Sequence, residues 1–145
     1  MIELFVDGAC SGNPGKGGWA FCVVKNNNVV HMESFGLKET TNNICELLAI
    51  RKGLAYCMAA FEDEEINVYS DSAYCVNGYN EWLDNWVKNG FLSSRKEPVK
   101  NQDHWKDLYK YKTNSKIKIF KIKGHSGHKY NSLVDRMAVD AYKNL

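Results

Sequence analysis

The sequence predicts an α/β fold in which helices flank a five-stranded mixed sheet. Three strand-like runs joined by short turns fill roughly the first 40 residues, and a long stretch of helical periodicity follows them. After that stretch, short strand-like runs alternate with helical segments. Because two strands joined by a helical crossover run parallel, we expect an antiparallel meander of three strands extended by parallel strands. The chain has 145 residues and shows no repeat or linker, so we expect one domain, residues 1–145.

The five expected strands are short runs of apolar or alternating residues. Ile2–Ala9 places Ile2, Leu4 and Val6 on one face, and "KNNN" is a turn signal between the strand-like runs "WAFCVV" and "VVHMESFGL". Ile66–Ser72 is a fourth run, and "KIKIFKIKG" alternates as a fifth, with lysines on one face.

Asn42–Ala59 is the clearest helix, because its apolar residues form a stripe at helical spacing and threonines and asparagines suited to capping crowd its start. Further helices are expected at Ser72–Asn89, Asn101–Lys112 and Leu133–Tyr142. A basic loop, "GFLSSRKEPVK", separates the first two of these.

Composition excludes several classes of protein. No apolar run approaches the roughly 20 residues of a membrane span, and the start "MIELFVDGAC" lacks the features of a signal peptide. The five cysteines are odd in number and never spaced C-x-x-C, which argues against a zinc ribbon and against a secreted disulfide framework. We therefore expect a reduced, cytoplasmic setting without a membrane partner.

Charge is distributed unevenly along the chain. Residues 1–87 carry 12 acidic and 5 basic side chains, whereas residues 88–145 carry 14 basic and 5 acidic ones. The basic excess, from Lys88 to Lys129, is interleaved with aromatic residues, a combination that suits a nucleic-acid backbone. A solvated lysine face would produce the same pattern, so charge alone leaves both readings open.

Four acidic residues lie near the ends of expected strands and helices, where carboxylates can bind metal ions. Asp7 and Asp71 end two strands expected to be parallel, and ligands bind at the carboxyl ends of such strands. Glu46 borders the apolar stripe of the first helix, and Asp135 lies near the start of the last one. Singly, Asp7, Asp71 and Glu46 are better explained as turn, cap or helix-end charges, whereas a charge beside apolar positions is less expected at Asp135. Together they would require cations, Mg²⁺ above all, and two such ions would support phosphodiester cleavage.

Four sequence blocks resemble those of type 1 ribonuclease H, in the same order: "FVDGACSGNPGKGGW", "TTNNICELLAI", "VYSDSAYCVNG" and "KGHSGHKYNSLVDRMA". The segment "WLDNWVKNGFLSSRKEPVKNQDHW" resembles the basic protrusion of bacterial members. The resemblance implies a ribonuclease H-like fold and an endonuclease that hydrolyses the RNA strand of RNA–DNA hybrids, leaving 5′-phosphate and 3′-hydroxyl ends. It also implies two Mg²⁺ ions, for which Mn²⁺ can substitute, bound by Asp7, Glu46, Asp71 and Asp135, and it places the family's catalytic histidine at His125.

The resemblance also implies which residues contact the hybrid: Cys10, Asn13, Asn42, Asn43 and Asn77 at the minor groove, Thr41 at a DNA phosphate, Trp82 in the DNA channel, and Arg95, Lys96 and Lys100 in a positively charged loop. An RNA-specific enzyme must sense the 2′-hydroxyl, which the shallow minor groove exposes. Simpler roles remain open, because Thr41 and Asn42 also suit helix caps and Trp82 suits a core. Ala73 occupies a position where many members carry glutamine, which puts cleavage preference in doubt.

His125 and His128 are spaced like zinc ligands, but no cysteine follows Cys75 to complete a zinc site. An imidazole with a pKa near 6.5 suits proton transfer beside Asp135, so we expect His125 to be catalytic and His128 to be a loop or helix-start residue. A catalytically silent hybrid-binding module, a resolvase- or transposase-like nuclease and a reverse-transcriptase domain are the alternatives. The native-looking start and the complete last helix favour a free-standing enzyme, and a monomer is the default expectation.

Overall fold

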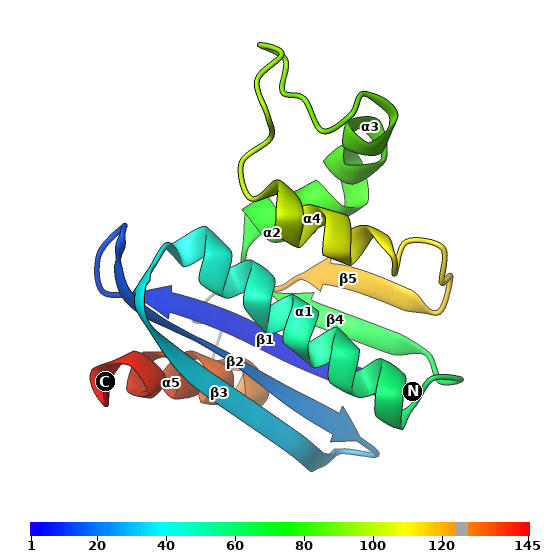
Figure 1. Ribbon diagram of the computed structural model, residues 1–145. Coiled ribbons are helices and arrows are strands. Elements are labelled where there is room, and N and C mark those ends of the chain that lie inside the picture. The colour runs from blue at the N-terminus through cyan, green and yellow to red at the C-terminus, as the bar shows by residue number, and fades with distance from the viewer. Residues whose placement is uncertain (124–127) are drawn as a thin grey trace.

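The computed structural model describes residues 1–123 and 128–145 (Figure 1). Its strands are β1 (Ile2–Cys10), β2 (Gly15–Lys25), β3 (Asn28–Thr40), β4 (Ile66–Ser70) and β5 (Ile117–Lys121). Its helices are α1 (Asn42–Ala60), α2 (Ala73–Asn77), a π-helical turn η1 (Gly78–Trp82), α3 (Leu83–Lys88), α4 (Gln102–Tyr109) and α5 (Lys129–Lys143).

The five strands form one sheet in the order β3-β2-β1-β4-β5. β1, β2 and β3 pair antiparallel, whereas β1 with β4 and β4 with β5 pair parallel. The predicted meander with parallel strands is therefore confirmed. One detail of β5 differs from the prediction that its lysines share a face, because Phe120 follows Lys118 on that face and Lys121 points to the other.

The expected helix at Ser72–Asn89 is present, but the π-helical turn η1 interrupts it. A Cβ atom on Gly78 would lie 2.6 Å from Cζ2 of Trp105, so only glycine lets this indole pack against the turn. The Lys112 ammonium donates to the Tyr79 carbonyl at 3.0 Å, and the Asn80 amide donates to a carbonyl of β5 at 3.1 Å. The turn is thus tied to α4 on one side and to the sheet edge on the other.

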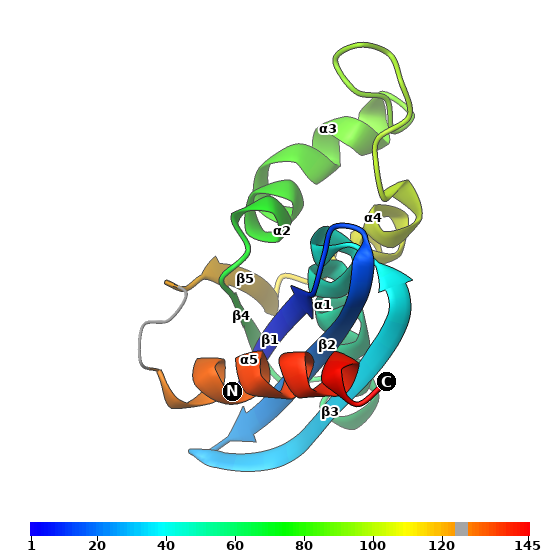
Figure 2. The ribbon, with the colours of Figure 1, turned by 90° about the vertical axis from the view of Figure 1, so that its left-hand side faces the viewer.

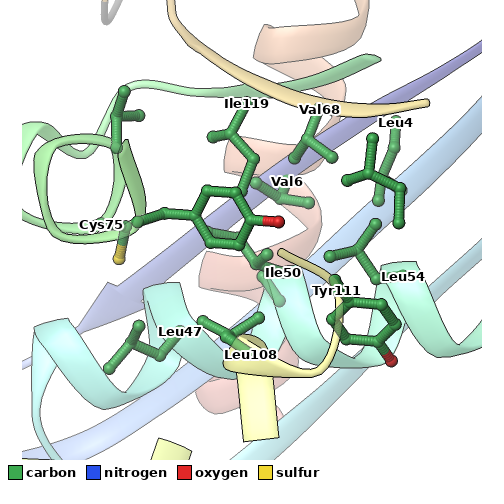
Figure 3. Close-up of a cluster of buried hydrophobic side chains, with 14 of the residues drawn as sticks. Leu4, Val6, Leu47, Ile50, Leu54, Val68, Cys75, Leu108, Tyr111 and Ile119 are labelled. Atoms are coloured by element: carbon green, nitrogen blue, oxygen red, sulfur yellow. The ribbon is translucent and has the colours of Figure 1, made fainter. Parts of the chain in front are cut away.

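Each face of the sheet carries its own hydrophobic core. α1 covers the face that holds Leu4 and Val6, and the larger core lies there (Figure 3). α5 crosses the other face, where Phe5 packs near Val134 and Ala138 (Figure 2). In the described part of the chain, no helix is long and apolar enough to cross a membrane.

Candidate active site

Three of the four predicted acids meet at one edge of the sheet. Asp7, Glu46 and Asp71 each place a carboxylate oxygen within 4.8 Å of the others, and among the described residues this is the group of side chains suited to hold a metal ion. Asp7 and Glu46 are both buried, with 4% of their surface exposed, whereas Asp71 is half-buried. Such a cluster of hard oxygen donors without cysteine or histidine suits Mg²⁺ or a similar divalent ion.

The parallel pairing of β1 with β4 brings Asp7 and Asp71 together. The register aligns Phe5 with Tyr69, so the aspartates two residues further along each strand reach the same level at the carboxyl end of the sheet. The sequence predicted that the two aspartates lie together, although β1 continues past Asp7 to Cys10 and Asp71 is the residue after β4.

Gly8 lets Glu46 reach the two aspartates. A Cβ atom at Gly8 would lie 2.5 Å from the backbone of both Cys45 and Glu46. Only glycine therefore lets the backbones of β1 and α1 approach this closely. The Gly8 N–H donates to Asp7 Oδ1 at 2.9 Å and also to Glu46 Oε1. This role of Gly8 was not predicted, because nothing in the pair Asp7-Gly8 reveals which helix will pack against it.

Burial and mutual repulsion change the proton affinity of this cluster. Burial, together with the charges of Asp71 and Asp135, raises the pKa of Asp7 to about 7. Burial and the adjacent Asp7 raise the pKa of Glu46 well above its ordinary 4.5. At neutral pH the cluster therefore holds negative charge that the protein itself compensates poorly, which favours binding of a cation.

Asp135 approaches the cluster from α5. Its carboxyl group lies close enough to Asp7 to interact with it, although it stands outside the tight group of three. α5 begins at Lys129, one turn earlier than predicted, so Asp135 lies in the second turn of the helix. His128 caps this helix by accepting the Tyr130 N–H at 3.3 Å, which confirms a helix-start residue. His125 lies outside the described residues.

The residues assigned to the minor groove surround the turn between β1 and β2 and the start of α1. The Asn13 Oδ1 accepts the Asn42 N–H at 3.2 Å and so joins the two segments. The Cys10 thiol lies 2.5 Å from the Gly12 carbonyl oxygen. Thr41 is the N-cap of α1, accepting the Ile44 N–H at 3.2 Å, so the predicted capping role is confirmed. Asn42 and Asn43 are exposed at the first turn, and Asn77 is half-buried at the end of α2.

The remaining candidates lie beyond α2, on the projecting part of the molecule at the top of Figure 1. Trp82, with 38% of its surface exposed, ends the π-helical turn and contacts the half-buried Trp86 at 5.8 Å between ring centroids. A fully core role for Trp82 is therefore wrong. Arg95, Lys96 and Lys100 are exposed in the loop between α3 and α4. They share the projecting part with Trp82, but neither they nor Trp82 belong to the acidic group.

Sequence and structure comparisons identify the relatives of this chain. A family model described as RNase H matches residues 1–143. A protein named Ribonuclease H from Caldanaerobacter subterraneus subsp. tengcongensis is 44% identical over 145 residues, covering 99% of this chain and 92% of that protein. A protein of the same name from Thermoanaerobacter sp. (strain X514) is 42% identical over 144 residues, covering 99% and 90%.

Two solved structures share the fold at lower sequence identity. The PFV RNase H domain superimposes with a TM-score of 0.81 at 23% identity and covers 99% of this chain and 94% of that chain. LC11-RNase H1, solved in complex with an RNA/DNA hybrid, gives a TM-score of 0.74 at 21% identity and covers 99% and 98%. At these identities the two structures establish the architecture of this chain, and the assignment of chemistry depends on the nearer relatives.

Proposed function

The chain belongs to the ribonuclease H family, metal-dependent endonucleases that hydrolyse the RNA strand of RNA–DNA hybrids, and on that premise we propose which of its residues do this work. Asp7, Glu46, Asp71 and Asp135 hold two Mg²⁺ ions, and Mn²⁺ can take their place. The observation that carries the proposal is the meeting of three acids within 4.8 Å, one from β1, one from α1 and one from the residue that follows β4.

The donor set fits magnesium in its chemistry. All four side chains offer hard carboxylate oxygens. Burial raises the pKa values of Asp7 and Glu46, and no positive side chain in the described part of the chain balances their charge, so the site binds either protons or cations. Bound divalent ions supply positive charge that activates water and stabilises the leaving oxygen in phosphodiester hydrolysis. The chain contributes the fixed placement of the carboxylates, because rigid β1 and β4 hold Asp7 and Asp71 and the Gly8 N–H orients Glu46.

His125 carries a proton to or from the reacting oxygens in this proposal. A pKa near 6.5 lets an imidazole accept and release protons at neutral pH. The position in the sequence supports the role, because α5 brings Asp135, ten residues after His125, to the cluster.

The hybrid binds across the end of the sheet. Cys10, Asn13, Asn42, Asn43 and Asn77 contact the minor groove, where the 2′-hydroxyl distinguishes RNA from DNA. The hydrogen bond from Asn42 N–H to Asn13 Oδ1 supports this, because it makes the β1–β2 turn and the start of α1 one surface. Thr41 contacts a DNA phosphate. Its position at the N-terminus of α1 supports this role, because helix N-termini attract anions.

The projecting part of the molecule binds the DNA strand. Trp82 offers an exposed indole face to the sugar and base edges, and Arg95, Lys96 and Lys100 add positive charge toward the phosphates. We also assign the protein one domain over residues 1–145, a monomeric state and a cytoplasmic location. The single sheet supports the first assignment, and five free cysteines fit a reducing compartment.

The test is cleavage of a fluorescent RNA–DNA hybrid with and without Mg²⁺. Asp71→Asn should abolish Mg²⁺-dependent cleavage while circular dichroism shows an unchanged fold. Asp140→Asn, an exposed acid on α5, is the matched control and should keep full activity. Normal turnover by Asp71→Asn would refute the metal-site assignment. Double-stranded RNA and double-stranded DNA, offered in parallel, should remain uncut, and cleavage of either would favour another nuclease on the same fold.

A further inference from the structure

Helix α5 covers only part of its face of the sheet. It packs against β1, β2 and β3, and Figure 2 shows β4 and β5 extending beyond it. On the opposite face, Ile117 and Ile119 of β5 belong to the larger core. Because side chains alternate along a strand, Lys118 and Phe120 face away from that core, and Phe120 leaves 41% of its surface exposed.

Three aromatic rings form a row across this face. Phe5, Tyr69 and Phe120 are register partners on β1, β4 and β5. The ring centroids are 5.1 Å apart between Phe5 and Tyr69 and 5.7 Å apart between Tyr69 and Phe120, with the ring planes tilted by only 23° and 25°. Phe5 is buried beneath the start of α5 and Tyr69 is half-buried against the smaller core, so Phe120 is the exposed end of the row.

The row adjoins the acidic cluster. Phe5 and Tyr69 precede Asp7 and Asp71 by two residues, so their Cα atoms lie about 7 Å from those of the aspartates along the chain. The aromatic row therefore lies next to the acidic cluster along β1 and β4.

The charge around the exposed rings favours a polyanion. Lys118 lies beside Phe120 on this face. Lys121 points to the opposite face, and both it and Lys123 are exposed at the end of the same segment. In the next row, the register partners of Lys118 are the polar Asn67 on β4 and, beyond it, the partly buried Glu3 on β1. The positive charge thus gathers on the β5 side, where the exposed ring is.

We propose that Tyr69, Phe120 and Lys118 form an aromatic platform that binds single-stranded nucleic acid, namely an unpaired segment of the RNA strand that continues from the hybrid at the acidic cluster. Exposed aromatic rings stack on bases of any sequence, and lysines pair with the phosphates between them. Bases inside a duplex are stacked on their neighbours and cannot offer their faces to a row of protein rings, so the platform favours unpaired nucleotides. The inference rests on the proposed function, because it takes the acidic cluster as the point where the RNA strand is held.

The test compares a blunt hybrid with hybrids whose RNA strand carries an unpaired tail of about eight nucleotides at its 5′ or 3′ end. Each tailed substrate competes with the blunt one in a single Mg²⁺-containing reaction, which gives the ratio of their kcat/KM values. At low salt the unchanged protein should prefer at least one tailed substrate by about fivefold or more. Phe120→Ala should bring that ratio close to one. Phe35→Ala, which removes an exposed phenylalanine from the opposite edge strand, is the matched control and should keep the ratio.

The outcomes separate the platform from the proposed function. Cleavage of the blunt hybrid by the unchanged protein reports the function, whereas the ratio reports the platform. A ratio near one for both tails would overturn the platform, as would a ratio that Phe120→Ala leaves unchanged. Either result would favour a protein partner for this face instead. If no hybrid is cut, fluorescence anisotropy measures the affinity of the unchanged protein, Phe120→Ala and Phe35→Ala for a fluorescent oligouridylate. Equal affinities of the unchanged protein and Phe120→Ala would overturn the platform.

Discussion

Replacing Asp7 with asparagine should make the metal-free protein more stable at pH 8. The pKa of Asp7 rises from 3.8 to about 7 on folding, chiefly through burial. At about 1.36 kcal/mol per pH unit, this difference corresponds to about 4 kcal/mol of unfolding free energy. Asparagine keeps an Oδ1 for the Gly8 N–H but carries no charge, so the expected gain is about 2 to 4 kcal/mol.

The pH dependence of this effect has a definite sign. Because the pKa of Asp7 is higher in the folded than in the unfolded state, the folded protein holds that proton more tightly. The resulting stability is full below about pH 4 and is lost as the pH rises through about 7. The gap between Asp7→Asn and the unchanged protein should therefore be wide at pH 8 and much narrower at pH 5.

Urea denaturation followed by circular dichroism, with a chelator present, measures both quantities. Asp140→Asn is the control for losing one acidic charge at an exposed position and should change stability by less than about 0.5 kcal/mol. Adding Mg²⁺ should stabilise the unchanged protein and stabilise Asp7→Asn less. If Asp7→Asn were no more stable than the unchanged protein at pH 8, the view of the cluster as uncompensated buried charge would be wrong.

Three further perturbations test other parts of the molecule. Gly8→Ala should cost roughly 3 kcal/mol of stability and impair cleavage, because its Cβ would collide with the backbone of Cys45 and Glu46. Urea denaturation measures the loss of stability. The control is Gly12→Ala, whose Cβ would have its nearest contact at 3.1 Å and which should cost much less. Neutralising Arg95, Lys96 and Lys100 together should weaken hybrid binding and lower the slope of log affinity against log salt by up to about 3, and an unchanged slope would exclude this loop from the interface. His125→Ala should slow turnover on the order of 100-fold without abolishing it, whereas total loss with stoichiometric zinc in the unchanged protein would point to a metal ligand.

The sequence predicted the sheet and the helices because their signals are local and repeated. Alternation marks β1. The apolar stripe predicted that α1 is a helix, but it marks the side that packs on the sheet only in part, because that side also holds Cys45, Ala49 and Gly53. The meeting of Asp7 with Asp71 was also predictable, because it needs only two parallel strands and the rule that ligands bind at their carboxyl ends. Periodicity predicts regular strands and helices, but it does not predict the irregular features of the fold.

The features that escaped prediction depend on contacts between distant segments. Gly8 matters because of the particular turn of α1 above it, and the π-helical turn at Gly78 depends on a tryptophan from another helix. The exposure of Phe120 was missed for a different reason. Alternating lysine and isoleucine suggested one basic face, but the alternation shifts at Phe120, so the aromatic side chain takes the place where the next lysine would stand.

The residues that are hardest to reconcile with a stable fold are those to which we assign the chemistry. Burying Asp7 and Glu46 side by side raises the pKa of both, and a protein selected only for stability would have apolar residues there. The fold accepts the cost because the surrounding cores are well formed, with Leu4 and Val6 fully packed on the same strand that presents Asp7. Such a local conflict between polarity and burial marks a functional site, since structure alone gives no reason to keep it.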